Sequence, residues 1–356
     1  MRNVQEKITK VLEELSLDGV LISNGYNMRY ISGFSGATGY LFLSQKRNII
    51  LTDFRYTIQA QSESEGFDII EVTGGDYSSV LKDLLDGENV KCLGFEDQDM
   101  LFASYSKLKE ALIEIEMVPV GDRISTLRSI KTKEELEYIE KAESIGDIAF
   151  SKILDIIKPG MTELEVAAHL EFLMKTNGAD GLSFDSIIAS GINSSMPHAT
   201  PSAKKIEIGD FVTMDFGCIY KGYCSDMTRT IVIGKASEEQ KKVYNTVLEA
   251  QMASLEFIKE GYLGKEVDAV ARNIIYKAGY EGCFGHGLGH SVGLEIHENP
   301  RLSPTEEGII LANMTETIEP GIYIKGFGGV RIEDLVAVTE NGCVNYAHST
   351  KHLIEL

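Results

Sequence analysis

LDIIKPGMTELEVAAHLEFLMKTNGADG occupies residues 154–181 and has a second copy, LEFIKEGYLGKEVDAVARNIIYKAGYEG, at residues 255–282. The two segments align without a gap at an offset of 101 residues. The shared positions include the glycines that bound the helical pattern: Gly160, Gly178 and Gly181, which recur as Gly261, Gly279 and Gly282. Two unrelated amphipathic helices could share apolar positions by chance, but matched glycines at both ends favour an internal repeat. We therefore predict an α+β domain of two similar halves related by a pseudo-twofold, with a site in the cleft between them.

The stretch between the two copies carries a pair of aspartates. It reads DFVTMDFGCIYKGYCSDMTRTIVIG from residue 210 to 234, and it has the pattern of two strands joined by a tight turn at 220–222. A two-residue loop there would place Asp215 and Asp226 on one face of the hairpin, opposed or diagonal. Two carboxylates so placed repel each other unless a cation lies between them. The alternative, in which one aspartate caps the turn and the other is solvated, fits poorly with two aspartates in apolar strands.

Two further acids follow the second copy. Glu319 lies in TIEPGIYI, and Glu333 lies in GGVRIEDLVAV beside Arg331. An isolated acid in a strand usually faces solvent, so neither glutamate alone would indicate a site. Glu316, in the same stretch as Glu319, is an alternative only if the register slips, because the Glu-Pro-Gly turn fixes the choice of Glu319.

A histidine-rich segment lies between these acids and the hairpin. FGHGLGHSVGLEIHE, residues 284–298, contains His286, His290 and His297 together with four glycines, which argue against a helix. One histidine and the four acids above form a set that divalent metals favour. Four carboxylates are too many for one typical zinc site. We therefore predict two ions, ~3.5–4 Å apart, that share bridging carboxylates.

Composition bounds the remaining possibilities. The formal charge is −20, which disfavours nucleic acid and anionic membrane as partners. The five cysteines are scattered and form no CxxC pair, which is typical of a reduced protein. The first residues, MRNVQEKITKVLEEL, have the pattern of an amphipathic helix rather than a signal peptide, and no apolar run approaches ~18 residues. We expect a cytoplasmic protein.

The first third of the chain alternates helical and strand-like patterns, which predicts a small α/β domain. A long helix follows, and its start is marked by a capping box of Thr132 and Glu135. We place an N-terminal domain at residues 1–125 and the catalytic domain at residues 126–356.

Taken in order, the motifs MDFG, SDMTRT, HGLGH, IHE, TIEPGIY and GGVRIEDL resemble the metallopeptidase family of proline dipeptidase (prolidase), aminopeptidase P and methionine aminopeptidase, which has the pita-bread fold. The stretches NMRYISGFSGATGYLFL and LTDFRYTIQA are similar to the N-terminal domain of the proline-specific members. Methionine aminopeptidases lack that domain, so the resemblance favours the proline-specific branch. It covers nearly the whole chain.

The resemblance implies a role for each candidate residue. Two Mn, Co or Zn ions would be held by the following ligands: Asp215 on one ion, Asp226 and Glu333 as bridges, and His290 with Glu319 on the other. The residues implied in catalysis or substrate binding are Glu319 as the proton carrier, His297 and His198 at the substrate or the tetrahedral intermediate, and Arg301 and Arg331 as substrate ligands. His286 is left between a contact that supports the ligands and simple loop packing. For His198, His297 and Arg301 the alternative is an ordinary surface side chain.

The implied reaction is hydrolysis of the bond between any residue and proline by a water that two metal ions activate to hydroxide. A dipeptidase acting on small proline-containing peptides is the first reading, and an aminopeptidase P acting on longer peptides is the alternative. Metal-free binding modules and amidine hydrolases also use this fold, but they typically lack one or more of the five ligands, and this chain lacks none. We also expect a homodimer.

Overall fold

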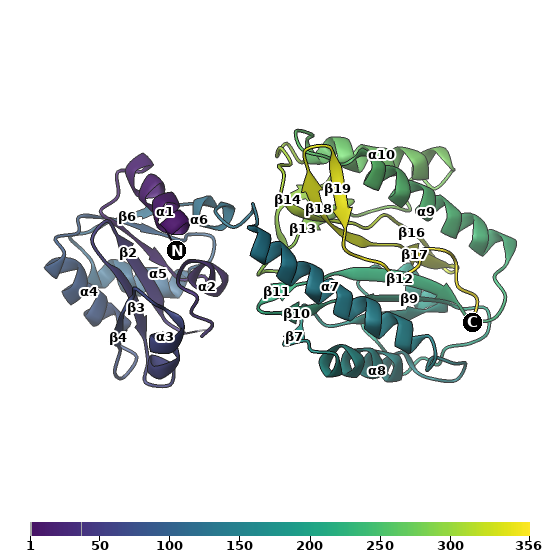
Figure 1. Cartoon of the computed structure of the whole chain (residues 1–356), viewed down its shortest axis with the longest axis horizontal. Coiled ribbons are helices and arrows are strands. Elements are labelled where there is room, and N and C mark those ends of the chain that lie inside the picture. The colour runs from purple at the N-terminus through teal and green to yellow at the C-terminus, as the bar shows by residue number, and fades with distance from the viewer. Residues whose placement is uncertain (1, 37) are drawn as a thin grey trace. The chain divides into compact units, whose positions relative to one another are not determined.

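The computed structural model describes residues 2–36 and 38–356, and the chain divides into two compact units, Met1–Arg128 and Ser129–Leu356 (Figure 1). The sequence predicts the boundary after residue 125. The first unit contains a single mixed sheet with helices on both faces. The second unit has helices and several mainly antiparallel sheets, which agrees with the predicted α+β class.

In the first unit, a six-stranded sheet has the order β4-β3-β2-β1-β5-β6. Its central strand β1 alternates between two cores: Val20 and Ile22 pack with α1, α2, α3 and α6, and Leu21 packs with α4 and α5. This alternation follows from the period of two along a strand. The elements are α1 (Arg2–Glu14), β1 (Gly19–Ile22), α2 (Gly25–Ser32), β2 (Tyr40–Ser44), β3 (Asn48–Thr52), α3 (Thr57–Glu63), β4 (Asp68–Glu71), α4 (Tyr77–Gly87), β5 (Cys92–Phe95), α5 (Phe102–Ala111), β6 (Glu116–Pro119) and α6 (Arg123–Thr126).

The second unit begins with the helix that the capping box predicts. Thr132 accepts from the backbone of Glu135, and the Glu135 side chain accepts from the backbone of Thr132. The elements of its first half are α7 (Lys133–Ile153), α8 (Glu163–Thr176), β7 (Gly181–Leu182), β8 (Ile187–Ser190), η1 (Gly191–Ser195), β9 (Phe211–Phe216), β10 (Cys218–Tyr220), β11 (Tyr223–Cys224) and β12 (Met227–Val232). Those of its second half are α9 (Glu238–Phe257), α10 (Gly264–Lys277), β13 (Gly289–Ser291), β14 (Glu298–Leu302), β15 (Thr315–Ile318), β16 (Gly321–Ile324), β17 (Gly328–Arg331), β18 (Asp334–Thr339) and β19 (Gly342–Asn345).

The sequence repeat is also a structural repeat. Helices α8 and α10 begin and end 101 residues apart, and each follows a glycine in the left-handed region, Gly160 at φ 93° and Gly261 at φ 92°. Both copies make the same backbone hydrogen bonds to a later segment: Gly160 N to Ile206 O (2.8 Å) and Ile206 N to Met161 O (2.8 Å), and then Gly261 N to Ile310 O (2.9 Å) and Ile310 N to Tyr262 O (2.9 Å). The two copies are therefore equivalent in backbone path.

Each half of the second unit has its own apolar core. Helices α7 and α8 pack against β8, β9 and β12, and helices α9 and α10 pack against β15, β16, β17 and β18. Within this unit, Figure 1 shows α7 and α8 on one side of the strands and α9 and α10 on the other. The strands between the two helix pairs are thus the place where residues of both halves meet.

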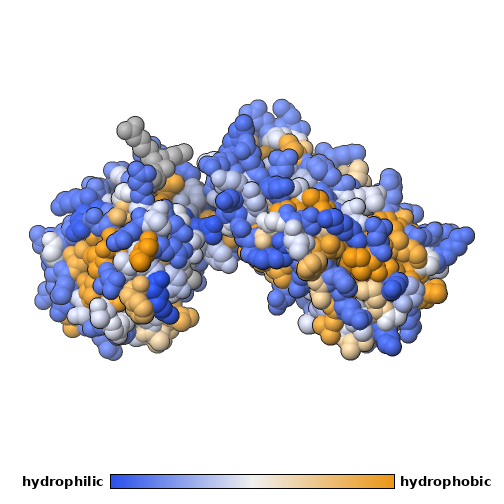
Figure 2. Space-filling model, turned by 60° about the horizontal axis from the view of Figure 1, so that its bottom comes forward, coloured by the Kyte–Doolittle hydropathy of each residue, from blue (hydrophilic) through white to orange (hydrophobic). Residues whose placement is uncertain are grey.

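Hydrophilic side chains cover much of the face of each unit that Figure 2 shows, with smaller hydrophobic areas between them. In the described ranges, 2–36 and 38–356, no helix is long and apolar enough to cross a membrane.

Candidate metal centre

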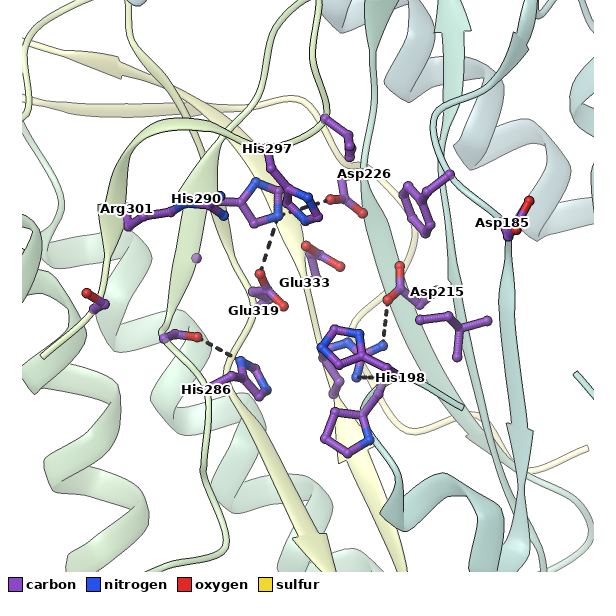
Figure 3. Close-up of a pocket in the computed structure, with 18 residues that line it drawn as sticks. Asp185, His198, Asp215, Asp226, His286, His290, His297, Arg301, Glu319 and Glu333 are labelled. Atoms are coloured by element: carbon purple, nitrogen blue, oxygen red, sulfur yellow. Dashed lines mark hydrogen bonds and ion pairs between the residues drawn. The ribbon is translucent and has the colours of Figure 1, made fainter. Parts of the chain in front are cut away.

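A pocket of about 550 Å³ lies in the second unit, and residues of both halves line it (Figure 3). Every residue that the sequence analysis assigned to metal, catalysis or substrate is among them: Asp215, Asp226, His290, Glu319, Glu333, His198, His297, Arg301 and Arg331. His286 also lines the pocket, whereas Glu316 does not. The fold therefore gathers into one site residues that span 136 positions from the loop after η1 to the strand ends near the C-terminus.

Asp215 and Asp226 reach the pocket from one hairpin. Strand β9 pairs antiparallel with β12, with Asp215 opposite Thr228. The turn has the two-residue form that the sequence predicts, because Tyr220 pairs with Tyr223. Asp226 lies two residues before Thr228, so the two aspartates lie diagonally on the same face. Both are buried.

His290 faces the carboxylates through an unprotonated ring nitrogen. Its Nδ1 lies 3.1 Å from the carbonyl oxygen of Ser291, which can only accept, so the proton resides on Nδ1 and Nε2 keeps its lone pair. Nε2 is 3.4 Å from Asp226 Oδ2 and 3.6 Å from Glu319 Oε1. One potential ligand atom from each of Asp226, His290 and Glu333 lies within 4.8 Å of the others. Burial lowers the pKa of His290 and so favours the neutral form that binds metals.

Three acids of the centre, Asp226, Glu319 and Glu333, are protonated more readily than exposed acids. Burial is the largest cause in each case and raises the pKa of Asp226 and of Glu333 well above the ordinary range, and that of Glu319 to about 7. Neighbouring carboxylates add to the effect, because like charges disfavour a further ionisation. Asp215 Oδ1 is buried and has no hydrogen-bond partner within the described ranges.

The raised pKa values and the unpartnered oxygen of Asp215 are both explained by a bound cation. A divalent cation among the acids would favour their ionised forms and would give the buried oxygen of Asp215 a partner. The donor set of carboxylate oxygens and one imidazole nitrogen also suits a borderline divalent ion such as Mn, Co or Zn. The residues therefore fit a centre for divalent metal.

Arg331 is held by groups of the protein. It donates from Nη2 to Asp215 Oδ2 at 2.5 Å, from Nε to Thr228 Oγ1 at 3.0 Å and from Nη1 to Tyr323 Oη at 2.8 Å. Tyr323 lies 2.9 Å from His286 Nε2, and His286 Nδ1 lies 2.7 Å from the carbonyl oxygen of the next residue. The hydroxyl therefore donates to His286. A hydrogen-bonded chain therefore runs from His286 through Tyr323 and Arg331 to the carboxylate of Asp215.

The other candidates also line the pocket. The ring of His297 meets the ring of His290 edge-on at a centroid distance of 4.5 Å. Burial, and then the neighbouring His290, lower the pKa of His297 to about 4, so it is neutral near pH 7. In Figure 3, Arg301 lies beside His290 at one side of the pocket and Asp185 lies at the opposite side. The apolar lining consists of Phe184, Ile187, Pro197 and Ile296.

Sequence reasoning missed Tyr323 and Thr228, which link Arg331 to the site. Both belong to motifs of the family resemblance, TIEPGIY and SDMTRT. A signal was available, since a polar side chain two positions from a predicted ligand on a strand shares its face. Thr228 meets this condition, and it also donates to Glu333 Oε2 at 2.6 Å.

Comparison with known proteins accounts for this arrangement. Residues 137–340 match metallopeptidase family M24, and residues 5–130 match the creatinase/prolidase N-terminal domain. The chain belongs to metallopeptidase family M24. An Xaa-Pro dipeptidase of Pyrococcus furiosus, which shares 42% identity over 99% of this chain and 100% of its own length, is a full-length relative.

Solved structures of M24-like proteins show the same architecture. The Xaa-Pro dipeptidase from Bacillus anthracis has a TM-score of 0.96 and 43% identity, covering 100% of this chain and 99% of that chain. The X-Pro aminopeptidase from Thermotoga maritima has a TM-score of 0.91 and 37% identity, covering 98% of this chain and 100% of that chain. The α+β fold with an N-terminal creatinase-type domain, which the motifs implied, is confirmed.

Proposed function

We propose that the chain is a metal-dependent exopeptidase that hydrolyses the bond between the first residue and proline in dipeptides. The observation that carries the proposal is the pocket in which four carboxylates and one imidazole converge. Full-length relatives named Xaa-Pro dipeptidase, from Pyrococcus horikoshii and Pyrococcus furiosus, support the same substrate class. All five ligand positions are filled, which argues against a metal-free binding module.

The site would hold two divalent ions, with Mn, Co or Zn as candidates. The ligands would be Asp215, Asp226, His290, Glu319 and Glu333, of which Asp226 and Glu333 would bridge. When bound, the ions supply an activated water and a Lewis acid for the scissile carbonyl. Two ions rather than one are favoured by the number of buried carboxylates, since a single site seldom uses four.

Glu319 is the group suited to move a proton. Its carboxylate lies in the pocket with Oε1 3.6 Å from His290 Nε2, where it could accept a proton from water and return it to the leaving nitrogen. His297 is neutral near pH 7 and can therefore donate one N–H to a developing oxyanion. His198 lies on the pocket lining and could make a second such donation.

Substrate length separates the two candidate activities. A bond to proline is a tertiary amide without an N–H, so a site that recognises the ring and a free terminus suits it better than one that binds an extended backbone. Arg301 lines the pocket beside His290, where it could bind the carboxylate of a dipeptide. The aminopeptidase from Thermotoga maritima keeps the alternative open, in which longer peptides are cleaved.

A paired assay tests the proposal. Purified protein loaded with Mn, Co or Zn is given Ala-Pro and Ala-Pro-Ala, and kcat/KM is measured for each. We expect the dipeptide to be the better substrate. A preference for the tripeptide would assign the chain to the aminopeptidases, and cleavage of neither peptide with any of the metals would refute an Xaa-Pro peptidase. Sedimentation would test the predicted homodimer in the same samples.

A further inference from the structure

Lys131 is a buried cation that the pocket chemistry described above does not use. Only 1% of its side chain is exposed. Its Nζ donates to Glu298 Oε2 at 3.1 Å and to Ser291 Oγ at 3.3 Å, and its backbone N–H donates to Asn313 O at 2.9 Å. Lysine is almost never fully buried unless its charge is paired. The ion pair with Glu298 therefore supplies the negative charge that the buried ammonium requires.

The ammonium of Lys131 donates to two residues, and each of them comes immediately after a histidine of the pocket. Ser291 follows His290, and Glu298 follows His297. Ser291 and Glu298 are cross-strand partners of β13 and β14, at a point where the register shifts. His290 and His297 line the pocket, whereas Lys131, Ser291 and Glu298 do not.

The two histidines are not held equally. His290 belongs to β13, which lies between β14 and β15, and its backbone N–H donates to Thr317 Oγ1 at 3.1 Å. His297 is the last residue of the loop 292–297 that joins β13 to β14. The path of this loop decides where the His297 ring lies.

Glu298 fixes the end of that loop. Its Oε1 accepts from the backbone N–H of Glu295 at 3.3 Å. Its carboxylate also packs against Gly293, so closely that a Cβ there would lie 2.5 Å from Oε1. The pair of Lys131 and Glu298 therefore holds the loop 292–297 folded onto its own end.

A second buried acid, Glu316, makes no hydrogen bond to the ammonium of Lys131. It lies opposite Ser291 on β15, is fully buried, and has no hydrogen-bond partner on either carboxylate oxygen within residues 2–36 and 38–356. Burial holds the pKa of Glu316 well above its ordinary value, with Lys131 and Arg301 acting in the opposite sense and Glu306 and Glu298 adding to the rise. A neutral Glu316 does not compete with Glu298 for the ammonium.

We propose that Lys131 is a positioning residue: through Glu298, its ammonium holds the loop 292–297 so that His297 lies edge-on to His290 in the pocket. The centroids of these two rings are 4.5 Å apart. The inference rests on the proposed function, in which His297 donates to the reacting oxygen. Lys131 is not among the residues that line the pocket and acts only through the loop.

The first test replaces Lys131 by methionine, which keeps the apolar stem and removes the ammonium. We expect kcat for Ala-Pro to fall by about 10- to 100-fold, the loss that a misplaced group can cause, with KM and metal content close to wild type. Lys133→Met is the matched control, because the Lys133 side chain is 92% exposed and its ion pair, with Glu137, lies on the surface of the same helix. Wild-type kcat in Lys131→Met, or an equal loss in the control, would overturn the proposal.

A double variant separates positioning from general stability. In a His297→Ala background, Lys131→Met should cause no further loss of kcat, because the group that it positions is already absent. Additive losses would overturn the proposal, since Lys131 would then serve the fold as a whole.

Two further measurements keep the proposal testable if Lys131→Met does not fold, because that variant leaves a buried carboxylate without its cation. Glu298→Gln weakens the same link from the other side: it removes the counter-charge but keeps an amide oxygen that can accept from the ammonium. It should lower kcat and be non-additive with His297→Ala. A crystal structure of Glu298→Gln gives a readout that does not depend on activity. A His297 ring displaced from His290 supports the proposal, and an unchanged loop overturns it, even if the wild-type protein cleaves no Xaa-Pro peptide.

Discussion

Arg331 and Asp215 form an ion pair in which the guanidinium lies 2.5 Å from Oδ2 and leaves Oδ1 without a hydrogen-bond partner in the described part of the chain (Figure 3). One oxygen of the predicted ligand is therefore fixed by the protein and the other is available to a cation. The same arginine is held by Tyr323 and Thr228, so the orientation of Asp215 is determined by three neighbours. The role of Arg331 in binding substrate stays a prediction.

The first prediction concerns this ion pair. Arg331→Ala should weaken metal binding by roughly 10- to 100-fold, the usual cost of removing a group that orients a ligand. Calorimetric titration of the metal-free protein with Mn measures the change in affinity for metal. Lys325→Ala, on the exposed turn between β16 and β17, is the control. Normal metal affinity with a raised KM would instead identify Arg331 as a substrate ligand.

The second prediction distinguishes the two histidines of HGLGH. His290→Ala and Asp226→Ala should each lose metal and activity, because their ligand atoms lie at the centre of the acid cluster. His286→Ala should keep most of its metal, since its Nε2 is engaged by Tyr323 rather than by a carboxylate. Elemental analysis of the three purified variants measures this. A site emptied by His286→Ala and not by His290→Ala would contradict the assignment.

The third prediction concerns pH. Asp226, Glu333 and Glu319 have raised pKa values in the metal-free site, that of Glu319 about 7, so they retain protons that a cation must displace. Metal affinity should therefore increase from about pH 6 to about pH 8, with release of protons. Because a raised pKa gives stability that is lost as pH rises through the folded value, the metal-free protein should also lose stability over this range. The metal-loaded protein should not. Calorimetry in buffers of different ionisation enthalpy counts the protons.

Sequence could predict those parts of the site that local rules determine. The loop length of the hairpin sets its register, and the register places Asp215 and Asp226 diagonally on one face. Matched glycines marked the repeat because only a residue without a Cβ adopts φ near 90° easily. The position of Glu319 in the pocket and of Glu316 outside it also follows the Glu-Pro-Gly turn.

Other features depend on contacts between distant segments, which no local pattern encodes. Lys131 lies just before a helix in a stretch of charged residues, a pattern typical of a solvated lysine. Strands β13 and β14, more than 150 residues later, provide the partners of its buried ammonium. The fixing of Arg331 by Tyr323 and Thr228 likewise requires three strands to be in place. His286 could only be left undecided, because its partner Tyr323 lies on β16, 37 residues away.

The fourth prediction tests the histidines that are not ligands. His297→Ala and His198→Ala should each retain near-normal metal content and lower kcat by on the order of 10²-fold, as when one oxyanion donor is removed. His169→Ala, on the exposed face of α8, is the control. Metal content and steady-state kinetics on the same preparations decide the outcome. Loss of metal in His297→Ala would make that residue a ligand and would require a different set of five.

The last prediction concerns Arg301, which decides between the two substrate lengths. Arg301 lies on β14 opposite His290 and lines the pocket. Within the described ranges its backbone N–H donates to Glu306, whereas its guanidinium makes no hydrogen bond or ion pair. The guanidinium can therefore bind an anion from the substrate. A charge-assisted contact of this kind contributes about 1.5–3 kcal/mol. Arg301→Ala should therefore raise KM for Ala-Pro by roughly 10- to 100-fold while kcat stays within a few-fold. Cleavage of Ala-Pro-Ala should change little, because its carboxylate lies one residue farther from the scissile bond. Equal effects on both peptides would remove Arg301 from carboxylate recognition and weaken the assignment as a dipeptidase.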